Sequence, residues 1–191
     1  MHRIIAKKQN VKFFTTNINN NMNILPGVQE IHKEMTEWRH DFHMHPELSF
    51  EETRTSEIVA NKLESWGVEV TRGIAKTGVI GTLHGKREAP SETKVKSIGL
   101  RADMDALPME ELNDFEHKSK IPGKMHGCGH DGHTTMLLGA AKYLAATRNF
   151  HGTVHFIFQP AEEGGGGGGV MVNEGLFDQF PCDKIYGMHN W

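Results

Sequence analysis

Residues 152–163 read GTVHFIFQPAEE and predict a buried strand that ends in a pair of carboxylates. Side chains alternate between the two faces of a sheet along a strand. Here one face would carry three apolar residues and the other a mixed set: Val154, Phe156 and Phe158 against Thr153, His155 and Ile157. Glu162 and Glu163 follow directly, so the strand would deliver two acidic side chains to one edge of its sheet.

Helix and strand patterns interleave on both sides of this stretch. A Ser-x-x-Glu capping box at Ser49–Glu52 predicts the start of a helix that Gly67 would end. The other predicted elements are strands at 67–71, 78–84, 97–102 and 184–190, and helices at 28–42, 131–148 and 170–175. This alternation favours a layered α/β fold, with a mostly parallel or mixed sheet and helices on both faces.

The composition excludes several classes of protein. The 191 residues carry 21 Lys and Arg against 24 Asp and Glu, a balance that does not favour nucleic-acid binding. No apolar run approaches the roughly 18 residues of a membrane span, so we expect no membrane partner. Two cysteines do not form a disulfide framework, and we expect a reducing compartment, the cytoplasm.

The two ends of the chain differ from its middle. Residues 1–21 are rich in Asn and contain no acidic residue, and we expect them to form a disordered leader. The folded part would begin at about Met22. The chain stops directly after its last predicted strand, so we also expect it to be truncated.

Four polar clusters stand out, and three of them follow predicted strands. They are Asp103–Asp105, His126–His133, Gln159–Glu163 and His189. Ligands bind at the carboxyl edge of the strands in open α/β sheets, so we expect the clusters to meet there. Cys, His, Asp and Glu are the usual protein ligands of transition metals, and the pattern therefore predicts a metal site.

The second cluster combines one cysteine with three histidines. One glycine separates Cys128 from His130, so both side chains can turn toward one point; the alternative for Cys128 is a small buried apolar residue. His126 and His133 could each be a helix cap, a partner of a metal ligand or a substrate contact. Asp131 could cap the helix that follows.

The Glu162–Glu163 pair suits metal-assisted hydrolysis, because adjacent side chains diverge. One carboxylate could bind metal while the other takes a proton from water. A solvated acidic pair is the alternative. The six glycines at 164–169 are not a phosphate-binding loop, since no Gly-Lys-Ser/Thr follows, and they indicate a flexible or tightly turned loop.

Several motifs together resemble one enzyme family. They are WRHDFHMHPELS at 38–49, LRADMDALP at 100–108, MHGCGHDGH at 125–133, QPAEEGGG at 159–166 and MHNW at 188–191. The family is the metal-dependent amidohydrolase branch of the aminoacylase and carboxypeptidase-G-like metallopeptidases, with hippurate hydrolases, N-acyl-amino-acid hydrolases and plant hydrolases of indole-acetic-acid conjugates. The resemblance implies that residues 22–191 are the first part of a zinc-peptidase-like catalytic domain.

The resemblance also implies two divalent metal ions, for which the donor types suit zinc, manganese, cobalt or nickel. By motif, their ligands would be Cys128, His130, Glu163 and His189. Glu162 would act as general base and then acid, and Asp105 would orient a ligand histidine. Asp103 and His133 would orient ligands or contact the substrate. That substrate would be a small N-acyl amino acid, of the hippurate or N-acetyl type, and the full-length protein a homodimer or homotetramer.

The chain departs from the family in length. Family members are longer, with a lid and dimerisation domain and a last ligand histidine that these 191 residues do not contain. Two alternatives therefore stay open. The chain could be a dipeptidase or exopeptidase of the same superfamily, or a truncated metal-binding protein without catalytic activity.

Overall fold

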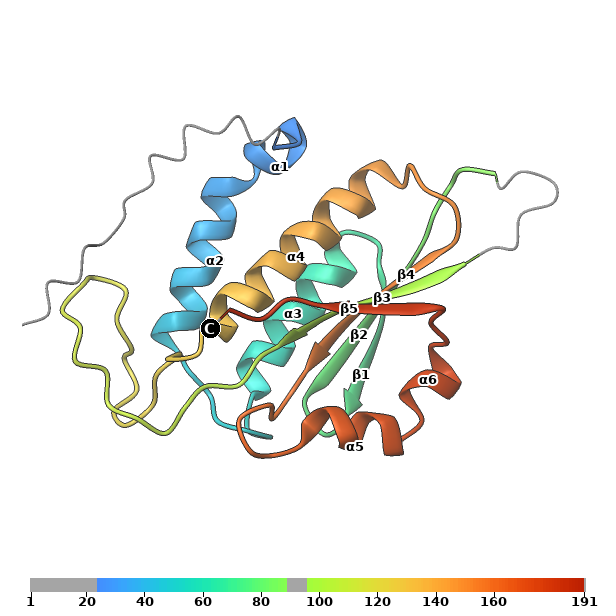
Figure 1. The fold of residues 1–191 in the computed structure, drawn as a ribbon. Helices are drawn as coiled ribbons and strands as arrows, with labels where there is room; N and C mark the ends of the chain where they lie inside the picture. The colour runs from blue at the N-terminus through green and yellow to red at the C-terminus, as the bar shows by residue number, and fades with distance from the viewer. Residues whose placement is uncertain (1–23, 89–95, 191) are drawn as a thin grey trace, which may run out of the picture.

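A computed structural model describes residues 24–88 and 96–190, and the predicted leader at 1–21 lies outside them. These residues form one five-stranded sheet with the strand order β1-β2-β4-β3-β5 (Figure 1). The strands are β1 (Glu69–Ile74), β2 (Gly78–His84), β3 (Ser97–Asp103), β4 (Thr153–Gln159) and β5 (Lys184–Gly187). β4, β3 and β5 are parallel, whereas β2 runs antiparallel to both β1 and β4. The predicted mixed sheet is confirmed.

Helices cover both faces of the sheet, as predicted (Figure 1). On one face lie α1 (Pro26–Glu30), α2 (His32–Met44), α3 (Thr53–Ser65) and α4 (His130–Thr147), and on the other α5 (Gly167–Asn173) and α6 (Leu176–Gln179). No helix in the described ranges is long and apolar enough to span a membrane.

Strand β4 lies between the two apolar cores and confirms the predicted alternation. Val154, Phe156 and Phe158 belong to the larger core, under α2, α3 and α4. Ile157 points to the smaller core, beside Met171 of α5. Both faces of the sheet therefore pack against apolar cores, and this packing fixes the position of its carboxyl edge.

The element boundaries shift where local turns intervene. The predicted helix at 28–42 is divided at Ile31 into α1 and α2. The strand predicted from Gly67 begins two residues later, because the amides of Gly67 and Val68 still close the end of α3 on Glu64 and Leu63. β5 ends at Gly187, short of its predicted end, and α5 begins inside the glycine run.

The predicted capping box is wrong. Helix α3 begins at Thr53, and its first amides are capped by the carboxylate of Glu47, which accepts from Arg54 N at 2.9 Å and Thr55 N at 2.8 Å. Glu52 occupies the N-cap position but its side chain makes no capping hydrogen bond, and Ser49 lies three residues earlier, in a turn that closes on Leu48. Their side chains reach toward the edge of the sheet instead.

Candidate metal centre

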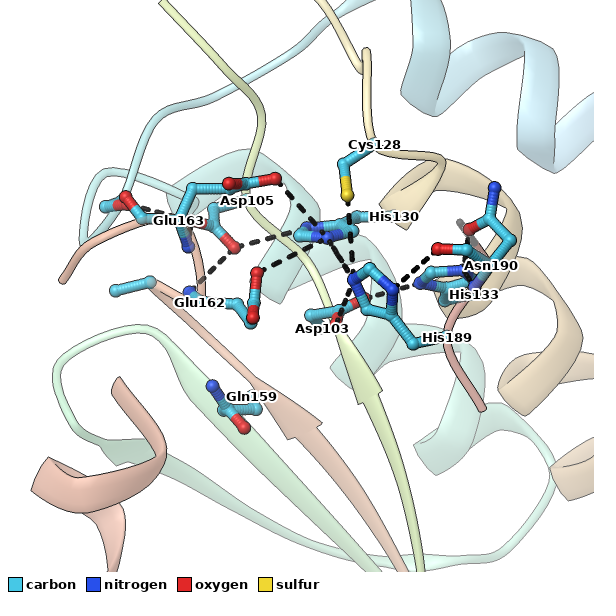
Figure 2. Close-up of polar contacts among 12 residues, drawn as sticks. Asp103, Asp105, Cys128, His130, His133, Gln159, Glu162, Glu163, His189 and Asn190 are labelled. Carbon is cyan, nitrogen blue, oxygen red and sulfur yellow. Dashed lines mark hydrogen bonds and ion pairs between the residues drawn. The ribbon is translucent and has the colours of Figure 1, made fainter. Parts of the chain in front are cut away.

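The four polar clusters meet at the carboxyl edge of the three parallel strands (Figure 2). β3 ends at Asp103, β4 at Gln159, and the chain beyond β5 brings His189 to the same place. Helix α4 begins at His130 and points its first turn at this edge. The convergence predicted from the strand ends is therefore present in the fold.

The side chains predicted to bind metal lie next to one another. His189 Nε2 is 3.3 Å from His130 Nε2 and 3.6 Å from Cys128 Sγ. Glu163 Oε1 is 3.7 Å from His130 Nε2. Two groups bring their ligand atoms within 4.8 Å of one another: Cys128, His130 and Glu163, and Asp103, His130, His133 and His189. His130 belongs to both groups.

The donor set fits a divalent cation. Glu163 Oε1 is buried, and no N–H or O–H group of the described residues donates to it. Burial and the nearby carboxylates of Glu163 and Glu162 raise the pKa of the Cys128 thiol to about 11. A thiol in such surroundings stays protonated unless a cation is bound beside it, and metal binding characteristically deprotonates cysteine.

Asp103 binds the ring of His133 at the buried side of the site. Its carboxylate is fully buried, and Oδ1 accepts from His133 Nδ1 at 2.7 Å while Oδ2 accepts from Arg101 at 2.7 Å. His133 Nε2 faces Asn190, where it contacts the side-chain Oδ1 and lies 3.3 Å from the backbone amide nitrogen. Arg101 and Asn190 lie in the sequence motifs, but nothing in their local pattern indicated these partners.

Asp105 joins two parts of the site (Figure 2). Oδ1 lies 3.3 Å from Nδ1 of His130, the ring that Asp105 is predicted to orient. The same carboxylate accepts from the backbone amides of Glu162 and Glu163, both at 2.9 Å, and from Ser49 Oγ at 2.7 Å. Burial works against ionisation, but hydrogen bonds from His130, Ser49 and the amides outweigh it and lower the pKa of Asp105 to about 2.

Glu162 and Glu163 occupy different environments. The Glu162 side chain is 37% exposed and that of Glu163 is 22% exposed, and Oε2 of Glu162 is 3.7 Å from His130 Nε2. Glu162 is thus the carboxylate that is more open to solvent.

The glycine run after this pair is a tight turn. Gly167 N donates to Ala161 O at 2.9 Å, and a Cβ at Gly167 would lie 1.8 Å from Pro160 O. At Gly165 it would lie 2.6 Å from Ala161 Cβ, whereas Gly169 faces open space. Of the two predicted forms of this loop, the structure therefore has the tightly turned one.

Asp131 does not cap α4, because Gly129 occupies the N-cap position in a left-handed conformation. Asp131 instead accepts from His43 Nδ1 at 2.9 Å and from Arg39 Nε at 3.2 Å. His43 Nε2 also donates to Glu111 at 3.1 Å, and these acceptors raise the pKa of His43 against the effect of burial. Helix α2 is thereby tied to the start of α4, a contact that sequence reasoning missed.

His126 belongs to neither group of ligand atoms. It is buried, and neither of its ring nitrogens has a hydrogen-bond partner in the described part of the chain. Burial lowers the pKa of His126 to about 4, so the ring is neutral near pH 7. It lies beside His43, with ring centroids 6.3 Å apart. None of the three predicted roles of His126 is visible in these contacts.

Comparison with known proteins identifies the family. The model of Peptidase family M20/M25/M40 matches residues 99–191. Residues 99–191 belong to the M20 peptidase family. A solved M20 structure, the Bacillus subtilis YXEP protein, described as a dinuclear metal-binding peptidase, superposes with a TM-score of 0.76 at 39% identity. The match covers 85% of this chain and 44% of that one.

Two curated relatives are similar over most of this chain. Hippurate hydrolase of Campylobacter jejuni is 49% identical over 169 residues, which are 88% of this chain and 42% of the relative. An IAA-amino acid hydrolase of Arabidopsis thaliana, ILR1-like 5, is 49% identical over 152 residues, which are 79% of this chain and 33% of the relative. The chain therefore spans less than half the length of these relatives.

Proposed function

We propose that this chain is the metal-binding part of an amidohydrolase that cleaves N-acyl amino acids of the hippurate type. One observation carries the proposal: the more exposed carboxylate, Glu162, lies beside the Cys128–His130–Glu163 group, in which His130 is buried, at the carboxyl edge of the sheet. The names of the relatives support the substrate class, because both denote hydrolases of an acylated amino acid.

We propose that the site binds two divalent ions. Cys128, His130, Glu163 and His189 would hold them, and Asp105 and Asp103 would fix the rings of His130 and His133. Thiolate and imidazole suit zinc, cobalt or nickel, and the carboxylates also allow manganese. When bound, such ions polarise an amide carbonyl and lower the pKa of water.

Glu162 would move the proton. Its carboxylate accepts a proton from the water as the water oxygen bonds to the amide carbon, and it then gives this proton to the amine nitrogen as the C–N bond breaks. The products are a carboxylic acid and a free amino acid. The exposure of the Glu162 side chain leaves its carboxylate accessible from solvent.

The cytoplasm is the compartment that we propose for this chemistry. Cys128 and Cys182 are both free, and a thiolate ligand needs a compartment in which thiols stay reduced.

The test begins with metal content. We would load the purified 191-residue chain with zinc, cobalt, manganese or nickel, remove the excess, and measure ions per chain by elemental analysis. The expected result is close to two ions per chain, and a clear reduction in the variant Cys128→Ala. Metal content near zero would contradict the proposal.

Turnover is then measured as glycine released from hippurate. We expect Glu162→Gln to keep its metal while the rate falls by about 10²- to 10⁴-fold, because a positioned general base contributes that much. An unchanged rate would overturn the role of Glu162. Metal bound with no turnover by the parent chain would favour a metal-binding protein without catalytic activity.

A further inference from the structure

Glu52 is a buried acid with no role in the proposed chemistry. Its side chain is wholly buried at the start of α3, and it does not cap that helix. Burial of an ionisable side chain is costly unless its polar atoms are satisfied. The partners that satisfy this carboxylate therefore indicate what it does in the fold.

The two oxygens of Glu52 join two segments that are distant in sequence. Oε1 accepts from the backbone amide of Ala161 at 2.8 Å. Oε2 accepts from the hydroxyl of Thr77, in the turn between β1 and β2. The Glu52 carboxylate thus connects the start of α3, the β1–β2 turn and the loop that carries Glu162.

These three segments are the strained parts of the backbone. Five non-glycine residues in the described ranges have a positive φ, and four of them lie within two residues of Glu52, Thr77 or Ala161: Phe50 at 62°, Ala75 at 50°, Lys76 at 70° and Ala161 at 51°. Such a conformation is unfavourable for a residue that has a side chain. Strained residues persist where surrounding contacts fix them, and this happens most often at functional sites.

Two buried carboxylates hold three consecutive amides at the site. Glu52 accepts from the amide of Ala161, and Asp105 accepts from those of Glu162 and Glu163. The left-handed turn at Ala161 lies between the two acceptors. Glu52 therefore fixes the backbone at Ala161, and the conformation there sets the direction in which the Glu162 side chain points.

We propose that Glu52 is a positioning residue, which holds the Glu162 carboxylate in place through the backbone amide of Ala161. This inference rests on the proposed role of Glu162 as general base. Asp105 alone holds the amides after the turn, and without Glu52 the strained turn at Ala161 would relax into other conformations.

Three variants separate positioning from simple burial. Glu52→Leu removes the acceptor and keeps a side chain of similar size. Glu52→Gln keeps an oxygen for Ala161 N, and its amide can donate to the Thr77 hydroxyl, which also accepts. Thr77→Val is the matched control, because it removes the other contact of Glu52 and leaves the bond to Ala161 intact.

The measurement is amide hydrogen exchange by NMR at residues 161–163, with the amides of α4 as an internal reference. In Glu52→Leu we expect exchange at 161–163 to accelerate at least tenfold relative to α4. In Glu52→Gln and Thr77→Val the ratio should stay within about threefold of the parent. If Glu52→Leu does not fold, Glu52→Asp gives the same comparison, because its carboxylate is one methylene too short to reach both partners.

Two results would overturn the inference: an unchanged ratio in Glu52→Leu, or an equal acceleration in Thr77→Val. The exchange measurement does not depend on activity, so it is independent of the test of the proposed function. If the parent chain hydrolyses hippurate, Glu52→Leu should lower kcat and leave KM unchanged, while Thr77→Val should change neither. A KM effect without a kcat effect would also contradict positioning of the base.

Discussion

The two halves of the candidate site are fixed in different ways. His130 is the first residue of α4, where the helical hydrogen bonds set the backbone, and Cys128 lies two residues before it, ahead of the N-cap Gly129. Glu162 and Glu163 arrive on a loop between β4 and α5, where the backbone amides bind buried carboxylates. The helix supplies the order of the first half locally. The order of the second half depends on residues that are distant in the sequence: Asp105 is 57 positions from Glu162, and Glu52 is 109 positions from Ala161.

Asp105 contacts both halves of the site. A substitution of this residue should therefore disturb both of them. In Asp105→Asn, the side-chain NH₂ must face one of the donors that the carboxylate now accepts from. We expect a loss of about 3 kcal/mol in the free energy of unfolding, since buried donors are left unpaired. Metal affinity should fall about 10- to 100-fold, as is usual when a residue that orients ligands is changed.

Urea unfolding and a competition titration with a chelator check the two effects of Asp105→Asn. Both should appear together. Lowered stability with unchanged metal affinity would show that the two halves are not coupled through Asp105.

Loss of the contact between His43 and Asp131 tests only the half of the site that contains Cys128 and His130. Because the pKa of His43 is raised above its usual 6.5, mainly by the hydrogen bond to Asp131, the stabilisation is complete below pH 6.5 and declines as the pH rises through the folded-state pKa. Glu111, His126 and His117 also face the His43 ring. Replacement by Gln should cost about 2 kcal/mol at pH 6.

Urea unfolding of parent and His43→Gln chains at pH 6 and pH 9, in the presence of a chelator, measures this effect. The difference between the two chains should shrink at pH 9. An equal difference at both values would show that the charge of His43 does not contribute. Exchange at residues 161–163 should keep its ratio to that of α4, since this variant leaves the Glu162 loop untouched.

Glu47 provides the smallest effect and a reference for both halves. Its carboxylate caps α3 and contacts no predicted ligand. Glu47→Ala should cost about 1 kcal/mol of stability, as the loss of a helix cap usually does. Metal content by elemental analysis should not change. A loss of metal here would mean that general destabilisation, and not the local contacts, accounts for the effects above.

The sequence predicts the regular elements well, because they rest on periodicity. The alternation in β4 and the apolar helix α4 are visible in a few consecutive residues, and the strand ends place the polar clusters on one edge. The adjacency of Cys128, His130 and Glu163 follows from that placement together with the motif resemblance.

The contacts that hold the site cannot be predicted in the same way. Ser49 and Glu52 have the spacing of a capping box, but tertiary partners at Asp105 and Ala161 compete for their side chains and win. Asp131 lies inside the first turn of α4, past the N-cap Gly129, and binds His43. In each case the side chain does form hydrogen bonds, as its type predicts. Its partner, however, lies in a distant segment that a single sequence does not reveal.

The six glycines at 164–169 have a consequence for how this gene can vary. By composition the tract is uniform, yet its positions are under unequal steric constraint. A side chain at Gly167 would collide with Pro160 O, and one at Gly165 with Ala161, whereas Gly169 has free space around it. A mutational library across the tract would therefore be depleted of replacements at Gly165 and Gly167 and permissive at Gly169. What looks like a low-complexity repeat is a set of positions that differ in the side chains they can accept.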